Sequence, residues 1–322
     1  MTSLLDPSIL FFVFGAFAGL VRSNLEIPPQ VSRFLSLYLL MALGLKGGFA
    51  LAKSGFTFTV ASGIGAAVLL AIVVPLIGYA LLRRVLPPLD AVALAATYGS
   101  VSAVTYITAV QNLDNMGIAY GGHMSAAMAL MESPAIILAV VMANLQRRRA
   151  AGAAAGSVEP LRLGKVLHES FTDGAQLLLL GAMIVGLLTG ERGKAVMQPF
   201  SVDLFKGMLA FFLLDMGLLA ARNFKEVLGK SRWVLAYAVV GPLVHASLAL
   251  ALAAVLGLPV GDGALLMTLA ASASYIAVPA VLRFAIPEAN PSLYFGLSLG
   301  LTFPLNIVLG IPFYAKIASL AL

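Results

Sequence analysis

The chain has 322 residues, of which 61% are hydrophobic and 11% charged, with a mean hydropathy of +0.99. A soluble domain carries roughly 45–50% apolar and about 25% charged residues, so this composition excludes a water-soluble fold. The net charge of +6 is typical of basic cytoplasmic loops in a membrane protein and does not indicate nucleic-acid binding. Because the sequence has no cysteine, it excludes disulfides, thiolate catalysis and cysteine-bound metals.

Apolar segments of about 20 residues, long enough to cross a bilayer, recur along the whole sequence. They predict an all-α integral membrane protein with ten transmembrane helices in two halves of five. The first half, 1–145, holds spans at 7–22, 31–51, 57–83, 89–110 and 118–145. The second half, 166–322, holds spans at 168–189, 202–221, 232–256, 262–284 and 291–318. A linker rich in Ala and Gly, 146–165, joins them.

Most Lys and Arg residues fall on one side of the membrane if the N-terminus lies outside. The positive-inside rule then predicts that both termini are outside and that the linker, which contains Arg147, Arg148 and Arg149, is cytoplasmic. The predicted outer side keeps six basic residues: Lys46, Lys53, Arg192, Lys194, Lys206 and Lys316.

Three blocks of sequence recur in the second half at nearly constant offsets of 173, 172 and 170 residues. They pair Gly44 with Gly217, Ser100 with Ser272, and Pro134 with Pro304. Five spans per half place the second copy upside-down in the membrane. Such 5+5 inverted repeats are typical of secondary transporters.

Two runs of small and hydroxylated residues, YGSVSAVT (98–105) and ASASYIAVP (271–279), fall near the middle of the fourth and ninth spans. Gly and Ser weaken a helix, so both spans are predicted to be broken there. Non-helical backbone at membrane depth must be buried in protein or line a cavity. The helix N-termini after the breaks then form an anion site. The predicted lining is Ser100, Ser102, Thr105, Ser272, Ser274 and Tyr275.

Two alternatives stay open for these runs. Small residues also let membrane helices pack closely without any binding site. Carbonyls and hydroxyls freed by the breaks also suit a sodium ion, which prefers oxygen ligands.

Ionisable residues inside spans are costly and usually functional. Glu132 is a predicted cation ligand or proton carrier, or else a structural carboxyl near Pro134. Asp215 is equally compatible with function and with a hydrogen bond that braces the bundle. Lys46 is expected to reach toward the outer surface, and Arg283 to anchor the topology.

Other polar residues in the spans give weaker signals. His123, His168 and His245 are scattered, and His245 is expected to pack near a kink. Asn306 is expected to hydrogen-bond to a neighbouring helix or to the site. The sequence contains no HExxH, GxSxG or P-loop motif, so an enzyme is not predicted.

The pattern YGSVSAVT, ESPA, a basic linker, ASASYIAVPA and PEANPSLYFGLSLGLTFPLNI resembles the sodium-dependent bicarbonate transporter family of cyanobacterial type (the SbtA family). The resemblance runs along nearly the whole chain and is most specific over 271–307. It implies a bacterial plasma (inner) membrane protein that forms a homotrimer. It also implies a gate domain (spans 1, 2, 6 and 7), a core domain (spans 3–5 and 8–10) and an elevator-like movement.

The resemblance also implies where the ligands bind. Bicarbonate is expected where the fourth and ninth spans cross, at Gly99, Ser100, Val101, Ser102, Thr105, Ser272, Ala273, Ser274 and Tyr275. Sodium, the expected coupling ion, is placed on Ser102, Glu132 and Ser274. A PII-like cytoplasmic regulator is a further implied partner, although the linker is shorter than in the cyanobacterial proteins.

The chain departs from the family at Tyr275, where cyanobacterial members carry an acidic residue. The loss of that carboxylate removes a natural sodium ligand. The leading hypothesis is sodium-dependent symport of bicarbonate or a similar small anion. A sodium-independent carrier of small carboxylates, a channel, and a non-transporting anion sensor or scaffold are the alternatives.

Overall fold

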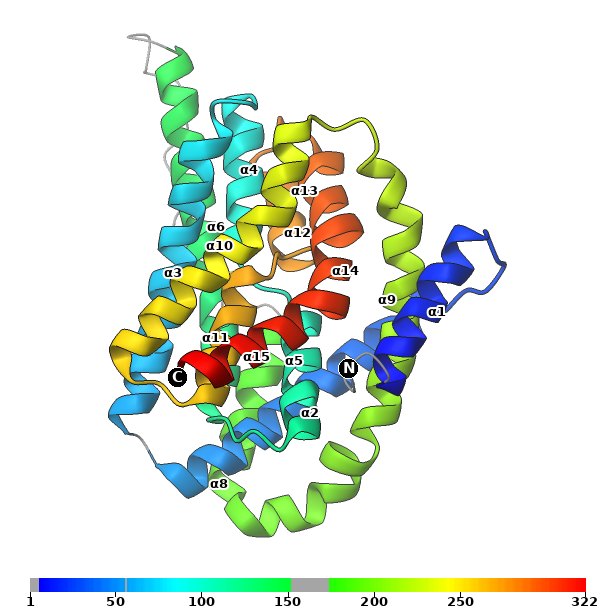
Figure 1. Ribbon diagram of the computed structural model, residues 1–322, viewed down its shortest axis with the longest axis vertical. Helices are drawn as coiled ribbons and strands as arrows, with labels where there is room; N and C mark the ends of the chain where they lie inside the picture. Colours follow the sequence, from blue (N-terminus) through cyan, green and yellow to red (C-terminus); the bar gives the residue numbers. More distant parts are fainter. Residues whose placement is uncertain (1–5, 56, 152–173) are drawn as a thin grey trace.

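The computed structural model describes residues 6–55, 57–151 and 174–322, and these contain helices and turns but no strand. Figure 1 shows the helices packed into one bundle with a long axis. In the first half the helices are α1 (Pro7–Leu20), α2 (Pro29–Ser54), α3 (Phe58–Leu82), α4 (Pro88–Gly99), α5 (Ala103–Met116) and α6 (His123–Ala151). In the second half they are α8 (Gly174–Gln198), α9 (Phe205–Asn223), α10 (Arg232–Leu256), α11 (Val260–Ala271), α12 (Ala277–Ala285), α13 (Pro291–Leu297), α14 (Phe303–Leu305) and α15 (Ile311–Ala321).

Seven helical segments of the described chain are long and apolar enough to cross a membrane. They are Pro29–Lys53, Phe58–Leu82, Pro88–Met116, His123–Arg149, Gly174–Asn223, Arg232–Leu256 and Pro291–Ala321. The segment Gly174–Asn223 contains both α8 and α9, and Pro7–Leu20 and Val260–Ala271 are shorter apolar helices. The all-α membrane class is therefore confirmed, whereas the ten-span inverted repeat stays a prediction.

Local sequence sets many of the helix ends. Proline occupies the first turn of α1, α2 and α4, where its missing N–H costs nothing. Asp6 caps α1 by accepting a hydrogen bond from the Ser8 N–H at 2.8 Å. Gly117 and Gly257 end α5 and α10 in the left-handed conformation, which glycine adopts without strain.

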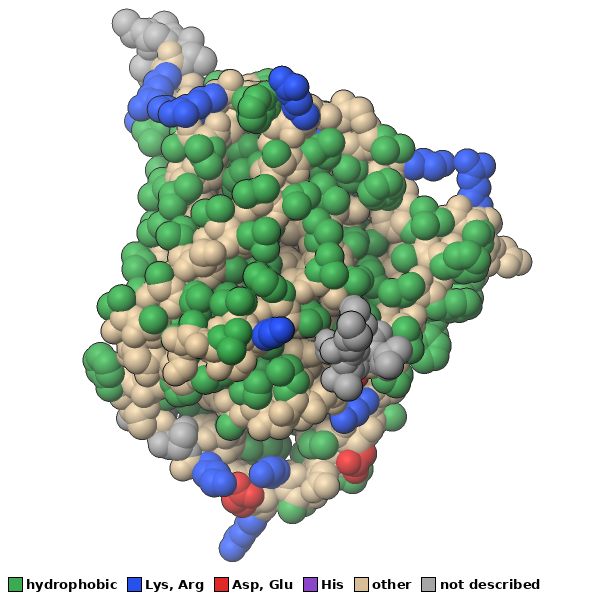
Figure 2. Space-filling model, viewed as in Figure 1, with side chains coloured by type: hydrophobic (Ala, Val, Ile, Leu, Met, Phe, Trp, Pro, Cys, Tyr) green, Lys and Arg blue, Asp and Glu red, His purple; other side chains and the backbone are tan. Residues whose placement is uncertain are grey.

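Side chains on the outside of the bundle are largely apolar, as lipid requires. Figure 2 shows hydrophobic side chains spread over the middle of the molecule, with most Lys and Arg toward its two ends and one near the centre of this face. Exposed examples include Phe17, Leu188 and Val255, which are 58%, 80% and 83% exposed. These side chains fit hydrocarbon and would be a liability in water.

Glycines let two pairs of helices approach closely: α1 with α9, and α2 with α8. A Cβ added to Gly217 of α9 would collide with the carbonyl oxygen of Phe12 in α1. A Cβ on Gly44 of α2 would likewise collide with the carbonyl oxygen of Leu179 in α8. Gly44 and Gly217 are the two glycines that the sequence repeat pairs, and each packs its helix on a helix of the other half.

We expect Gly217→Ala to lower the thermal stability of the detergent-solubilised protein, because the added methyl has no room against the α1 backbone. Overpacking of this kind costs about 1–3 kcal/mol. The matched control is Gly65→Ala in α3, where no heavy atom lies within 4 Å of the added Cβ. The control should be neutral or slightly stabilising, since alanine favours a helix by about 1 kcal/mol over glycine. Equal melting temperatures for the two variants would contradict the close contact.

The predicted linker begins inside α6. This helix continues through Arg147 to Ala151, so residues 146–151 are helical. Arg147 binds Glu288 with N–O distances of 2.9 and 2.7 Å, and its guanidinium also donates to the Ala285 carbonyl. These hydrogen bonds lower the pKa of Glu288 from its usual range. Residues 152–165 of the linker, and His168, lie outside the described residues.

Candidate anion site at the crossing of two broken helices

The fourth and ninth predicted spans are both interrupted where the sequence analysis places the breaks. Residues 100–102 separate α4 from α5, and residues 272–276 separate α11 from α12. Ser100, Ser102 and Ser272 have extended backbone conformations, with φ of −96°, −107° and −79°. Each break frees backbone N–H and C=O groups that an unbroken helix would have used.

The two breaks contact each other. The Ser102 N–H donates to the Ser272 hydroxyl oxygen at 3.0 Å, and the Ser274 N–H donates to the Thr97 carbonyl at 2.9 Å. All four residues are at most 4% exposed. Non-helical backbone is thus buried in protein, as it must be at membrane depth.

Hydrogen bonds already engage most of the serine hydroxyls at the crossing. Ser102 Oγ accepts from the Thr105 N–H at 3.2 Å and from the Thr105 hydroxyl at 2.9 Å, so it caps α5. Ser274 Oγ accepts from the Val278 N–H at 3.2 Å. Ser272 Oγ donates to the Leu269 carbonyl at 2.8 Å. These hydrogen bonds were not predicted, although serine is among the residues preferred at the N-cap of a helix.

Counting lone pairs and protons shows what the crossing still offers a ligand. A hydroxyl has two acceptor lone pairs and one proton to donate. Both lone pairs of Ser102 are used, so its remaining proton serves either the Tyr275 hydroxyl or a ligand. Ser274 also keeps its proton, and Ser100 Oγ has no partner although it is buried. The crossing therefore keeps hydroxyl protons of Ser100, Ser102 and Ser274 that can be donated to an anion, beside free lone pairs on Ser100 and Ser274.

Small side chains let the break pack tightly. A Cβ on Gly99 would collide with the ring of Pro75 in α3. Val101 and Ala273 are each 3% exposed and fill the breaks beside the serines. These three predicted site residues therefore shape the crossing and contribute no polar side-chain atom.

Tyr275 fills the space between the crossing and helices α1 and α9. Its ring centroid lies 5.1 Å from that of Phe303, which lies 5.6 Å from that of Phe12. Its hydroxyl lies 3.9 Å from the sulfur of Met216 in α9 and interacts with the Ser102 side chain. An aromatic side chain thus lies buried at the position where the resemblance leads us to expect an acid.

Glu132 joins α6 to α8. Its Oε2 accepts a hydrogen bond from Gln176 Nε2, and Gln176 is 6% exposed. The pairing of Glu132 with Gln176 was not predicted, because no local sequence signal links residues so far apart in the chain. Among the described residues no group of three or more His, Asp or Glu side chains could hold a metal ion.

The other singled-out residues have structural partners. Asn306 Nδ2 donates at 2.8 Å to the Ala271 carbonyl at the end of α11, so its predicted hydrogen bond to a neighbouring element is confirmed. His245 is 2% exposed and hydrogen-bonds to the backbone of Ala270. Arg283 is exposed in the last turn of α12.

Three of the remaining candidates pair across helices. Asp215 in α9 interacts with Ser32 in α2, which favours the bracing role, although its Oδ2 has no partner. Lys46 forms an ion pair with Asp114 at 3.2 Å and does not simply reach to the surface. His123 lies 3.5 Å from the buried Asp262, a pairing that the sequence analysis missed.

A comparison with protein families identifies the chain over nearly its whole length. Residues 7–319 match the model of the Na+-dependent bicarbonate transporter superfamily. None of the curated proteins compared with the chain is significantly similar to it in sequence. The family match covers the described helices up to residue 319 in α15, including both breaks. The chain therefore belongs to the Na+-dependent bicarbonate transporter superfamily.

Proposed function

We propose that the protein is a secondary active transporter that carries bicarbonate, or a similar small anion, by sodium-dependent symport. The observation that carries this proposal is the contact between two broken helices, where the hydroxyl protons of Ser100, Ser102 and Ser274 can be donated to an anion. The N-termini of α5 and α12 add positive partial charge beside those donors. Bicarbonate binds at Ser100, Ser102 and Ser274 in this proposal, with Thr105 holding Ser102 in place.

The transport movement in this proposal is elevator-like. Helices α1, α2, α8 and α9 form the gate, and the remaining helices form the core that carries the crossing. The close, glycine-lined contacts of α1 with α9 and of α2 with α8 support a rigid gate. We further propose a homotrimer in the bacterial inner membrane, with both termini outside and the linker in the cytoplasm.

Sodium is the proposed coupling ion, and we propose a ligand set that differs from the one expected from the sequence. Ser102 has no lone pair left, so Glu132, Ser274 and carbonyls freed at the breaks are better candidates. Tyr275 in place of an acid favours a second candidate function, a sodium-independent carrier of a small carboxylate. The two functions differ in one measurable property, which is the response of uptake to a sodium gradient.

Uptake of labelled bicarbonate into proteoliposomes tests the proposal. We expect uptake above that of protein-free liposomes, and faster uptake with an inward sodium gradient than with an equal choline gradient. Equal rates under both gradients would favour the sodium-independent carrier. No uptake under either gradient would overturn the proposal for bicarbonate, and a ligand screen by melting temperature would then identify another anion.

A further inference from the structure

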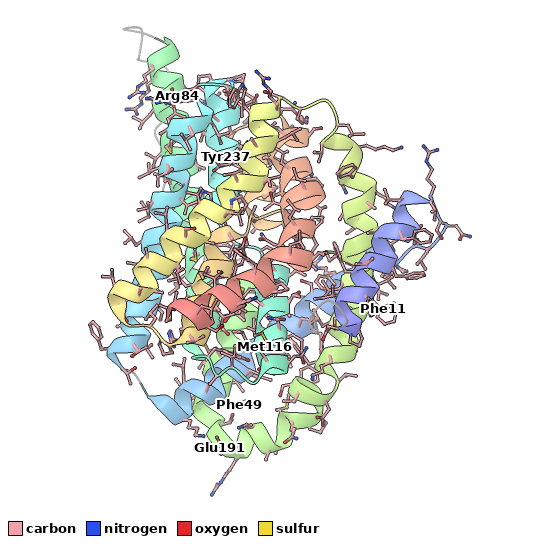
Figure 3. All side chains as sticks on the ribbon, viewed as in Figure 1. Phe11, Phe49, Arg84, Met116, Glu191 and Tyr237 are labelled. Carbon is pink, nitrogen blue, oxygen red and sulfur yellow. The ribbon has the colours of Figure 1, made fainter. Side chains whose placement is uncertain are left out.

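A cleft of about 500 Å³ lies beyond the C-terminal part of α5, away from the crossing. Its walls come from α2, α5 and the loop after it, the start of α6, α8, and the start of α9 with the turn before it. Figure 3 labels two of its lining residues, Phe49 and Glu191, at the opposite end of the molecule from Arg84. By the predicted topology this is the outer end of the protein.

Positive charge dominates the lining of this cleft. Its charged side chains are four lysines and two carboxylates: Lys46, Lys53, Lys194, Lys206, Asp114 and Glu191. The lining therefore has two positive charges in excess. Lys46 is 3.2 Å from Asp114, and Lys194 is 3.8 Å from Glu191. Lys206 donates to the amide oxygen of Asn115 at 3.4 Å. Within the described ranges Lys53 has no ion-pair partner, and it is exposed.

The acidic side chains of the cleft are already neutralised. Asp114 accepts a hydrogen bond from the Tyr120 hydroxyl at 3.0 Å in addition to its pairing with Lys46. Burial, and then the Asp114 carboxylate, raise the pKa of Tyr120, so Tyr120 stays protonated and remains a donor. Neither group therefore offsets the charges of Lys53 and Lys206.

One buried polar atom on the cleft lining has no protein partner. Gln111 is 3% exposed and lines the cleft, and its Oε1 accepts no hydrogen bond. Bicarbonate differs from nitrate or chloride in carrying one O–H donor besides its acceptor oxygens. The lysines can donate to the acceptor oxygens of bicarbonate, and the free amide oxygen of Gln111 can accept from its O–H group. Gln111 also lies nine residues after Ser102, so the cleft is about 14 Å along α5 from the crossing.

The size of the cleft determines whether an anion inside it keeps its hydration. A water molecule takes about 30 Å³ of liquid volume, so the cleft holds many waters beside a small anion. An anion there keeps most of its hydration and is attracted without being tightly bound. Charge of one sign in a low-dielectric cleft raises the local concentration of the opposite sign.

We propose that this cleft is a positively charged vestibule that concentrates small hydrated oxyanions, such as bicarbonate, at the end of α5 away from the crossing. The vestibule is formed jointly by α5 with its following loop and by helices α2, α8 and α9. Its role in uptake rests on the proposed function, whereas its positive potential does not. The two can therefore be tested separately.

The potential is measured with a single introduced cysteine, since the chain has none of its own. Val202 lines the cleft and is 38% exposed. In the Val202→Cys variant we expect an anionic methanethiosulfonate reagent to react about 10-fold faster than a cationic one, after correction for their rates with a free thiol. Adding Lys53→Gln and Lys194→Gln should remove most of this preference. The proposal would be overturned if the Val202→Cys variant showed no preference for the anionic reagent, or if the two added lysine substitutions left that preference unchanged.

Uptake in proteoliposomes then tests its role. The Lys53→Gln, Lys194→Gln double variant should raise the KM for labelled bicarbonate several-fold at low ionic strength and leave kcat unchanged. The difference from the unmodified protein should shrink as choline gluconate is added, because salt screens exposed charge. Lys316→Gln, which removes an exposed lysine of α15 outside the cleft, should leave KM unchanged. An equal rise in KM in the double variant and in Lys316→Gln would contradict a local effect of the cleft. If the unmodified protein takes up no bicarbonate, that result counts against the proposed function alone.

Discussion

Proteoliposomes that contain the Ser102→Leu variant are expected to take up no more labelled bicarbonate than protein-free liposomes. Ser102 is 4% exposed, and its hydroxyl caps α5 while its N–H binds Ser272 of the other break. Leucine removes the cap, which is worth about 1 kcal/mol, and removes a donor from the crossing. It also adds bulk in a packed interior, at a further cost of about 1–3 kcal/mol.

A milder change at the same position separates transport from folding. Ser102→Ala adds no bulk, so the variant should elute as a single species in detergent and yet transport bicarbonate with a raised KM. A hydrogen bond to a charged group is worth about 1.5–3 kcal/mol, which corresponds to a rise of roughly 10-fold to 150-fold. The control is Thr108→Ala, because the Thr108 hydroxyl bonds only to the Val104 carbonyl of its own helix. Unchanged uptake in Ser102→Ala would place the anion elsewhere.

The Tyr275→Asp variant is expected to be stabilised by sodium far more than the unmodified protein. Tyr275 is 5% exposed and lies between the crossing, Phe303 and Met216. A carboxylate in that place is costly unless a cation neutralises it. Sodium that binds only the folded state then raises the melting temperature by mass action. The measurement is the melting temperature in sodium chloride against choline chloride.

The neutral variant Tyr275→Asn is the matched control, since it has nearly the same shape as the aspartate variant and no charge. Both variants leave a cavity where the tyrosine ring was, so both should melt at lower temperature than the unmodified protein. Only Tyr275→Asp should recover stability with sodium. An equal sodium response in the two variants would show that position 275 does not face a sodium site.

Much of the helical framework could be predicted, because lipid imposes long apolar segments and proline marks where they start. The breaks could also be predicted, since hydroxylated and small residues destabilise a helix wherever it lies. The contact between the breaks was expected as a shared pocket, but its hydrogen bonds were not. The capping by Ser102 and Ser274 uses lone pairs that the sequence analysis assigned to sodium.

The pairings between distant residues could not be predicted. Glu132 with Gln176 and Lys46 with Asp114 join residues that are 44 and 68 positions apart. Such contacts depend on how whole helices pack, and one sequence carries no local signal for them. The same holds for the π-helical turns Ser298–Thr302 and Asn306–Gly310, which turn Asn306 toward the end of α11.

The hydrogen bonds between the two breaks limit how the protein can expose its ligand to either side. In a rocker-switch the two sequence halves tilt apart around the ligand, which would separate Ser102 from Ser272 and Ser274 from Thr97. Each polar group left buried without a partner would cost about 1–3 kcal/mol. Joint displacement of both breaks keeps these bonds. In the proposed elevator-like movement a bound anion keeps the same donors throughout its passage, so we expect its dissociation constant to be nearly equal at the two faces of the membrane.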